Sequence, residues 1–512
     1  MADVASTNIN SQATDDTHQL TRVQKLAYGA GDLNAAIAAA MTGFFLQPFL
    51  LDIAGLRPAL VGIIFLIMKL WDAVTDPLVG NLADHTDTKW GRKRAWLLFG
   101  AVPFGLTFWL VWYVPGFGTW ALFAYYLVMN IALRTAFTAV NVPYTALTPE
   151  LTDDYDGRTQ LTTYRFSFSL LGGLSAIVLH TPLVALAGEN NPELGHMISA
   201  TVWSIVIIAS AWVCYAFTFE RPKAKNAPQE EMLSPLGVMR LIFNNKPYLY
   251  IVAIYLLSWM AVQMVQVNLL LYLRYWFDDE SVFQILAIVI QVTAFVFLAV
   301  WGRVSQTYGK NQVYAMGASI WLVVMIAIYF IQPQQFWFLA IATFFAGVGT
   351  SVAYLMPWSM LPDAIEYNEL HTGSRHEGVF YGYFVFFQKM GIALGIALSS
   401  FVLDVGGYVP AIRVDQLSPE AQAIIQADPD NAVGTVINFE GFECEIYRLT
   451  DRSVNCRQSE TIQQMLRVFV SIVPAVLLAL SLPLAIFFPL TRETFDDIQE
   501  QLKKRKNDQL TL

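Results

Sequence analysis

The sequence predicts an all-α integral membrane protein with twelve transmembrane helices arranged in two six-helix halves. Of its 512 residues, 55% are hydrophobic and only 14% are charged, whereas about 25% of a soluble domain is charged. Twelve apolar runs are long enough to cross a bilayer as helices, which takes about 20 residues. A polar stretch divides these runs into six and six.

The predicted spans follow one another along most of the chain. They cover residues 24–50, 59–82, 96–115, 119–146, 165–187, 197–219, 246–277, 283–302, 312–331, 336–361, 379–403 and 465–489. Several are longer than a bilayer requires, so we expect them to tilt or to project beyond the lipid.

The distribution of basic residues predicts the orientation of the chain. Nearly all Lys and Arg residues of the short connections lie in one set of alternate loops, while the other set holds little besides Arg57. The positive-inside bias therefore predicts a protein of the cell membrane, such as a bacterial inner membrane, with both termini in the cytoplasm. The predicted regions are a disordered cytoplasmic tail (1–22), a first half (23–219), a cytoplasmic linker (220–245), a second half (246–490) with an extracytoplasmic insertion (404–464), and a cytoplasmic tail (491–512).

The insertion at 404–464 is long, polar and acidic, and it contains Cys444 and Cys456. Loops of this length are often functional, so the insertion is either a lid over the outer entrance or an inert elaboration. The two cysteines can form a disulfide if that side is oxidising; the alternative is two unpaired thiols. The net charge of −9 gives no support for nucleic-acid binding.

Ionisable residues inside predicted spans are the first functional candidates, because they are costly in a membrane. Lys69, Asp72 and Asp76 lie at i, i+3 and i+7 of the second span, which places them on one helix face. Two carboxylates one turn apart repel unless a cation or proton accompanies them. We therefore predict that Asp72 and Asp76 bind the coupling ion, Na⁺ or H⁺, with no other cofactor. The alternative is a structural salt bridge between Lys69 and Asp72.

Further polar residues on the first and fourth spans suggest a substrate site. Asp32 is predicted to accept a substrate hydroxyl rather than to cap a helix, because apolar turns follow it. The fourth span carries a polar stripe that includes Arg134 and Asn141. Arg134 either clamps an anionic substrate group or neutralises Asp32 or Asp76.

The second half supplies aromatic and amide side chains on shared helix faces. These are Trp259, Gln263 and Gln266, then Gln284 and Gln291, then Tyr354 and Trp358. Aromatic rings stack on sugar C–H faces and amides bind hydroxyls, so the mixture favours a polyol ligand. Lys389 in the eleventh span needs a partner; we expect it to pair with a carboxylate of the second span and to be released when a cation binds.

Corresponding loops in the two halves indicate an internal duplication. Gly80, Asp84 and the basic run beginning Gly91-Arg92-Lys93 follow the second span, and Gly302 and Gly309-Lys310 follow the eighth. Asp84 is predicted to cap a helix or to pair with the basic run, which includes Arg92, and so to lock helix ends. For the basic residues, simple positive-inside anchoring is the alternative.

Taken in order, several motifs resemble those of the glycoside-pentoside-hexuronide:cation symporter family, the melibiose permease group of the major facilitator superfamily. The motifs are Tyr28–Asp32, Trp71–Pro77, Trp90–Arg94, Asn141–Tyr144, Asp153–Arg158 with Tyr164–Arg165, and Asp363–Gly378 with Gln388–Lys389. The resemblance implies cation-driven sugar uptake. It matches Asp72 and Asp76 to the family's cation-site acids, and Lys389 and Arg165 to a lysine and an arginine of the family.

The chain also departs from melibiose permease. That permease holds its galactoside with an acid on the first helix and another on the fourth, where this chain has Ala36 and Asn141. An α-galactoside is therefore disfavoured, and Asp32 and Asn141 look like the glucuronide and xyloside members. Arg134 has no counterpart in the resemblance and suggests an anionic sugar.

The sequence thus predicts a monomeric secondary transporter that couples Na⁺ or H⁺ to symport of a glycoside, pentoside or hexuronide by alternating access. The alternative is a cation-coupled carrier of a lipid-like or other small organic anion, because animal lysolipid symporters resemble the same family. No nucleophile motif, metal cluster or phosphate loop suggests an enzyme. The predicted substrate-binding residues are Asp32, Arg134, Asn141, Gln263, Gln266 and Trp358. The predicted coupling and gating residues are Lys69, Asp84, Arg92, Arg165, Asp363 and Lys389.

Overall fold

The computed structural model describes most of the chain. The described residues are 20–152, 155–188, 191–220, 235–373, 376–427, 432–439, 442–450, 453–490, 494–495, 497–502 and 504. The predicted disordered tail at 1–22 therefore lies almost wholly outside them. So do most of the predicted linker at 220–245, most of the tail at 491–512, and the side chain of Asp84.

Apolar helices dominate the described chain, as the sequence predicts. The first half contains α1 (Arg22–Ala30), α2 (Leu33–Phe44), α3 (Leu46–Asp52), α4 (Pro58–His85), α5 (Arg94–Val111), α6 (Thr119–Thr145), α7 (Thr148–Leu151), α8 (Tyr155–Ala185) and α9 (Pro192–Phe217). The second contains α10 (Pro235–Asn244), α11 (Lys246–Tyr275), α12 (Phe283–Tyr308), α13 (Lys310–Phe330), α14 (Phe336–Thr372), α15 (Glu377–Val405), α16 (Pro419–Ala427), α17 (Glu460–Val470) and α18 (Ile472–Ile486).

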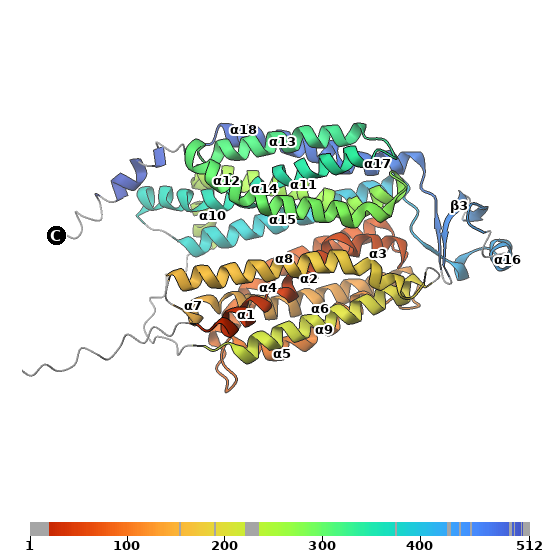
Figure 1. Ribbon diagram of the computed structural model, residues 1–512, viewed down its shortest axis with the longest axis horizontal. Coiled ribbons are helices and arrows are strands. Elements are labelled where there is room, and N and C mark those ends of the chain that lie inside the picture. The colour runs from red at the N-terminus through yellow and green to blue at the C-terminus, as the bar shows by residue number, and fades with distance from the viewer. Residues whose placement is uncertain are drawn as a thin grey trace, which may run out of the picture.

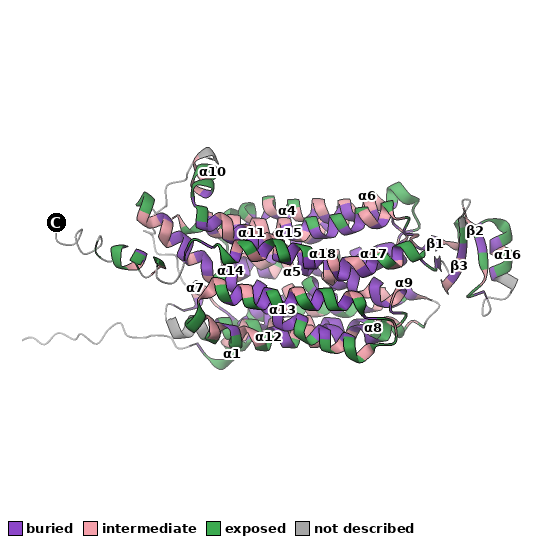
Figure 2. Ribbon diagram, turned by 90° about the horizontal axis from the view of Figure 1, so that it is seen from above, coloured by how far each residue is buried: buried purple, intermediate pink, exposed green. Residues whose placement is uncertain are grey.

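Among the described residues, eleven helices are long and apolar enough to cross a membrane, and the total is twelve when the bent segment α1–α3 is one span. Each predicted span falls on one of these segments, so the fold class is confirmed. Exposed residues recur along the outer helices of the bundle (Figure 2), and they include large apolar ones such as Leu78, which is 58% exposed. Such a surface suits a lipid environment.

The two halves lie side by side, with their helices roughly parallel to one long axis (Figure 1). The described residues nearest the two termini, α1 and residues 497–502, lie toward one end of the bundle, and the strands lie at the other; we call these the termini end and the sheet end. The halves pack chiefly through α4 and α15. At Gly62 of α4 an added Cβ would lie 2.9 Å from the Ser400 Cβ, so a small residue permits this close approach.

The first span is broken rather than continuous. The helix is interrupted between Ala30 and Leu33, and it bends by 43° between Phe44 and Leu46. At the first break, a Cβ on Gly31 would lie 2.5 Å from Tyr144 Cε2, so α1 reaches α6 only because glycine has no side chain. Hydropathy averaged over a span does not reveal such breaks, because they depend on tertiary contacts such as that of Gly31 with Tyr144.

The insertion is a folded unit, here called the sheet domain (residues 412–456). Strands β1 (Ile412–Arg413), β2 (Val436–Phe439), β3 (Phe442–Leu449) and β4 (Ser453–Cys456) form an antiparallel sheet in the order β1-β4-β3-β2. A disulfide joins Cys444 of β3 to Cys456 of β4, which confirms the predicted pairing. Buried Ile437 and Val454 contribute to a small core, so the described part of the insertion is a folded unit made of four strands and the helix α16.

Candidate functional site

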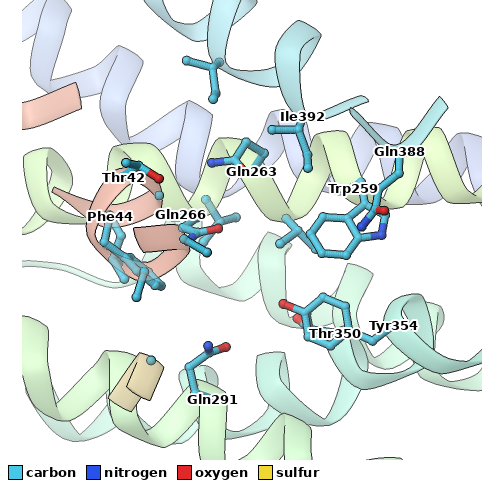
Figure 3. Close-up of a pocket in the computed structure, with 18 of the residues that line it drawn as sticks. Thr42, Phe44, Trp259, Gln263, Gln266, Gln291, Thr350, Tyr354, Gln388 and Ile392 are labelled. Atoms are coloured by element: carbon cyan, nitrogen blue, oxygen red, sulfur yellow. The ribbon is translucent and has the colours of Figure 1, made fainter. Parts of the chain in front are cut away.

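A central cavity of about 440 Å³ lies between the two halves, within the usual range for small-molecule sites. The first half lines it with Thr42, Phe44, Lys69, Arg134 and Phe137, and the second with Trp259, Gln263, Gln266, Gln291, Thr350, Tyr354 and Gln388, among others. In Figure 3 the amides of Gln266 and Gln291 approach one space from α11 and α12, and Gln388 lies beside Trp259. The cavity thus combines amide groups with aromatic faces.

Arg134 and Asp72 form a buried ion pair beside this cavity. The Asp72 carboxylate is 0% exposed. It accepts hydrogen bonds from Arg134 Nε at 2.7 Å and Nη2 at 2.5 Å, a bidentate geometry that is among the strongest in proteins. The guanidinium also lies over the ring of Phe137. Arg134 therefore pairs with Asp72, whereas the sequence analysis considered Asp32 or Asp76 as its partner.

Asp76 is held one turn further along α4. Thr138 Oγ1 donates to its Oδ1 at 2.9 Å, and Lys389 Nζ donates to its Oδ2. Helices α4 and α6 run in the same direction. Asp72 contacts Arg134 and Asp76 contacts Thr138, and in both pairs the two residues are 62 positions apart in the sequence. Lys389 belongs to α15, so this ion pair joins the two halves, as predicted for a carboxylate of the second span.

Lys69 has a different environment from these residues. It lines the central cavity, yet the structure shows no hydrogen bond or ion pair from its ammonium to any described residue. The alternative prediction of a Lys69–Asp72 salt bridge is wrong, because Arg134 occupies both carboxylate oxygens of Asp72.

Asp32 does not line the central cavity. It stands at the helix break before α2 and makes no capping hydrogen bond, because its Oδ1 accepts from Arg165 Nε at 3.1 Å. Both Asp32 and Arg165 were predicted as site residues, and the structure brings them together away from the cavity. The role of Asp32 in substrate binding stays a prediction.

Asn141 and Trp358 also fall outside the set of residues that line the cavity. The Oδ1 of Asn141 is buried and has no hydrogen-bond partner among the described residues. Trp358 Nε1 donates to Tyr255 Oη at 2.7 Å. Of the six predicted substrate residues, the structure places Arg134, Gln263 and Gln266 at the cavity.

At the termini end, each half has the same lysine clamp. Lys93, just before α5, donates to the Ala146 carbonyl at 2.8 Å and pairs with Glu150 at 2.7 Å. Lys310, at the start of α13, donates to the Ser359 carbonyl at 2.7 Å and pairs with Asp363 at 2.7 Å. In both halves the carboxylate follows the carbonyl residue by four positions. The repeated clamp agrees with the predicted duplication.

The basic run after α4 is also tied within the first half. The Arg92 guanidinium pairs with Glu150, and the Arg92 backbone N–H donates to Glu220 at 2.6 Å. These contacts give Arg92 specific partners beyond general membrane anchoring.

At the sheet end, a buried network that the sequence analysis missed joins the halves. Asp52 of α3 is 1% exposed, and its carboxylate pairs with Arg274 of α11 and accepts from Tyr408 Oη. Its carbonyl accepts from Asn455 Nδ2 of the sheet domain at 3.1 Å. We call this set, Asp52, Arg274, Tyr408 and Asn455, the outer latch. The sequence feature that could have indicated this network is Arg274, a lone arginine in the last turn of the apolar helix α11.

Comparisons with known proteins agree with this architecture. The family model described as "MFS/sugar transport protein" matches residues 27–427. An uncharacterised symporter of Synechocystis sp. is 32% identical, covering 94% of this chain and 97% of that protein. The sodium-dependent lysophosphatidylcholine symporter 1-A of Danio rerio is 27% identical over 80% of this chain and 83% of that protein. The inner membrane symporter YicJ of Escherichia coli is 28% identical over 75% and 83%.

Solved structures share the fold at low sequence identity. The nucleoside transporter NupG superposes with a TM-score of 0.57 and 13% identity, covering 91% of this chain and 98% of that one. A bacterial homologue of the human lysosomal transporter Spinster, in an inward-facing and unoccupied conformation, gives 0.59 and 12% over 94% and 96%. These structures show the same fold, and the family-model match confirms the predicted relationship to the major facilitator superfamily. The chain belongs to the MFS/sugar transport protein family, and it is a multi-pass membrane transporter rather than an enzyme.

Proposed function

We propose that this protein is a symporter that couples Na⁺ or H⁺ to uptake of a hydroxylated, sugar-like small molecule by alternating access. Three relatives with similarity over most of the chain are named symporters. The observation that carries the proposal is the ion pair between Asp76 and Lys389, because it lies beside the cavity and joins α4 to α15.

The coupling follows from competition for the Asp76 carboxylate. The side chain of Asp76 is 32% exposed, whereas Asp72 is fully buried against Arg134. A cation or proton therefore reaches Asp76 more readily, and its binding displaces the Lys389 ammonium. Losing this ion pair changes the contact between the halves, so ion occupancy biases which end of the cavity opens. Thermodynamic linkage then requires the solute to tighten ion binding by the same factor.

The chemistry of the cavity favours a polyol over a lipid. Four glutamine side chains and two threonines reach its walls, together with Trp259 and Tyr354. Amides and hydroxyls satisfy sugar hydroxyl groups, and aromatic faces pack on the C–H surface of a ring. The lysophosphatidylcholine relative from Danio rerio makes a lysolipid the second candidate, and the many apolar side chains in the cavity wall support it.

The orientation we propose places the sheet end outside the cell. The basic residues near helix ends, including Arg92, Lys93 and Lys310, lie at the termini end, which the positive-inside bias assigns to the cytoplasm. The disulfide of the sheet domain suits an oxidising compartment.

Removing the Asp76 carboxylate should uncouple the transporter. We expect Asp76→Asn to abolish accumulation against a gradient while solute exchange persists, because the neutral amide cannot exchange Lys389 for a cation. Allosteric coupling typically changes affinity by about 5–150-fold, and this dependence on the ion should disappear. The measurement is uptake into proteoliposomes with Na⁺ and pH gradients imposed separately over neutral glycosides, uronides and lysophosphatidylcholine.

Asp415→Asn provides the matched control, because it removes a carboxylate that is 63% exposed in the sheet domain. This variant should accumulate solute like the unmodified protein. Full accumulation by Asp76→Asn would contradict the proposed coupling. If neither the Na⁺ gradient nor the pH gradient drives uptake of any solute in the panel by the unmodified protein, the symporter proposal is wrong.

A further inference from the structure

The charges around the central cavity do not balance. Arg134, Lys389 and Lys69 provide three cationic groups, while Asp72 and Asp76 provide two carboxylates. Arg134 occupies Asp72, and Lys389 occupies Asp76. No acidic residue is among the described residues that line the cavity. The unmatched cation is therefore Lys69.

Lys69 is also placed where a ligand can reach it. Its side chain lines the cavity and is not highly exposed, and none of its hydrogen-bonding capacity is used by the described residues. An ammonium within a membrane protein is costly unless it faces water or pairs with an anion. An anionic ligand group would supply the missing charge and accept hydrogen bonds from the Nζ atom.

We infer that the transported solute carries a carboxylate, as a hexuronide does, and that Lys69 binds this group. The inference rests on the proposed transport function. Lys69 thus takes the anion-binding role that the sequence predicts for Arg134, because the Arg134 guanidinium already donates two hydrogen bonds to Asp72. Lys69 belongs to the first half, and the cavity amides belong to α11, α12 and α15 of the second half. A solute held at both ends thus bridges the halves.

The test compares two solutes that differ only in the relevant group. The probes are p-nitrophenyl β-D-glucuronide and p-nitrophenyl β-D-glucoside, with free glucuronate and glucose as a second pair and lysophosphatidylcholine as a third arm. Competition for uptake in proteoliposomes gives the affinity for each. We expect the unmodified protein to prefer each uronate over its neutral partner by about ten- to a hundredfold, because hydrogen bonds to charged groups have this strength.

The variants assign that preference to one residue. Lys69→Gln should lower the affinity for the uronate far more than the affinity for the neutral glycoside, so that the preference disappears, and Lys69→Arg should restore much of it because the charge returns. Gln266→Ala is the matched control. It removes an uncharged amide from the cavity wall and should lower the affinity for the uronate and for its neutral partner by the same factor. Thermal unfolding in detergent identifies any variant that fails to fold, and the preference of the unmodified protein is itself a test.

The possible results separate the inference from the function on which it rests. Cation-driven uptake of neutral glycosides, with no preference for uronates, would overturn the inference and leave the proposed function intact. A preference that survives in Lys69→Gln would overturn the role of Lys69. If Lys69→Gln impairs only lysophosphatidylcholine uptake, the anion is a lipid phosphate and the hexuronide assignment is wrong. Failure of every gradient to drive any probe would instead contradict the proposed function.

Discussion

Replacing Arg134 by glutamine should destabilise the protein by about 3–5 kcal/mol and abolish transport, because it leaves the carboxylate of Asp72 buried without a partner. Asp72 is 0% exposed, so water cannot take over the role of the guanidinium. Lys69 lies one turn away on α4 and can recover part of this loss by turning toward Asp72. The free energy of unfolding in detergent measures the effect.

The double variant separates the loss of the ion pair from the loss of a charge. Asp72→Asn with Arg134→Gln replaces the pair with two neutral groups, and paired removal of a buried salt bridge is often close to neutral. We expect the double variant to be more stable than Arg134→Gln alone and still inactive in transport. A double variant less stable than the single one would show that Asp72 is not the group that Arg134 compensates.

Breaking the outer latch should open the sheet end. In Asp52→Asn the ion pair with Arg274 is lost while Arg274 keeps its second partner, Glu280, at 2.7 Å, so we expect a cost of about 1.5–3 kcal/mol, the strength of hydrogen bonds to charged groups. We expect this cost to fall mainly on the state in which the sheet end is closed, because in that state the latch would hold α3 against α11. The equilibrium should shift toward the state open at that end, by tenfold or more, since every ~1.4 kcal/mol is a factor of ten.

A cysteine in the cavity reports this shift. Gln291→Cys places a thiol on the cavity wall, and Cys214, the one free cysteine among the described residues, is buried. A membrane-impermeant thiol reagent applied at the sheet end should label the reporter faster in the Asp52→Asn background. Glu445→Gln removes an exposed ion pair with Arg457 in the sheet domain and should leave the rate unchanged. Equal labelling in all three backgrounds would contradict the gating role of the latch.

The spans and their grouping follow from the sequence because membrane insertion imposes a simple rule. Each helix must bury about 20 apolar residues in lipid, so hydropathy locates it without reference to any neighbour. The pairing of Lys389 with a carboxylate of α4 was also predictable. An intramembrane lysine needs a counter-ion, and the charged face of α4 offers two.

Contacts that depend on helix register could not be predicted in this way. The Asp52–Arg274 pair joins residues 222 positions apart, and nothing local marks either as a partner of the other. Arg134 faces Asp72 rather than Asp76 because of the register in which α4 and α6 pack, which places Thr138 against Asp76. The break at Asp32 depends on the approach of Gly31 to Tyr144, which is a tertiary contact. The strands of the sheet domain are short, so the alternation of apolar and polar residues along each strand is hard to distinguish from the polar sequence around it.

The sheet domain also bears on how other conformations of this transporter can be visualised. Helical membrane bundles in detergent micelles offer few external landmarks for aligning particle images. Here a disulfide-linked domain extends beyond one end of the helices (Figure 1). Hydrogen bonds anchor it to both halves, through Asn455 to Asp52 of α3 and through Tyr447 to the Arg274 carbonyl of α11. An antibody fragment bound to this domain would therefore provide an alignment mark whose tilt reports the opening of the bundle.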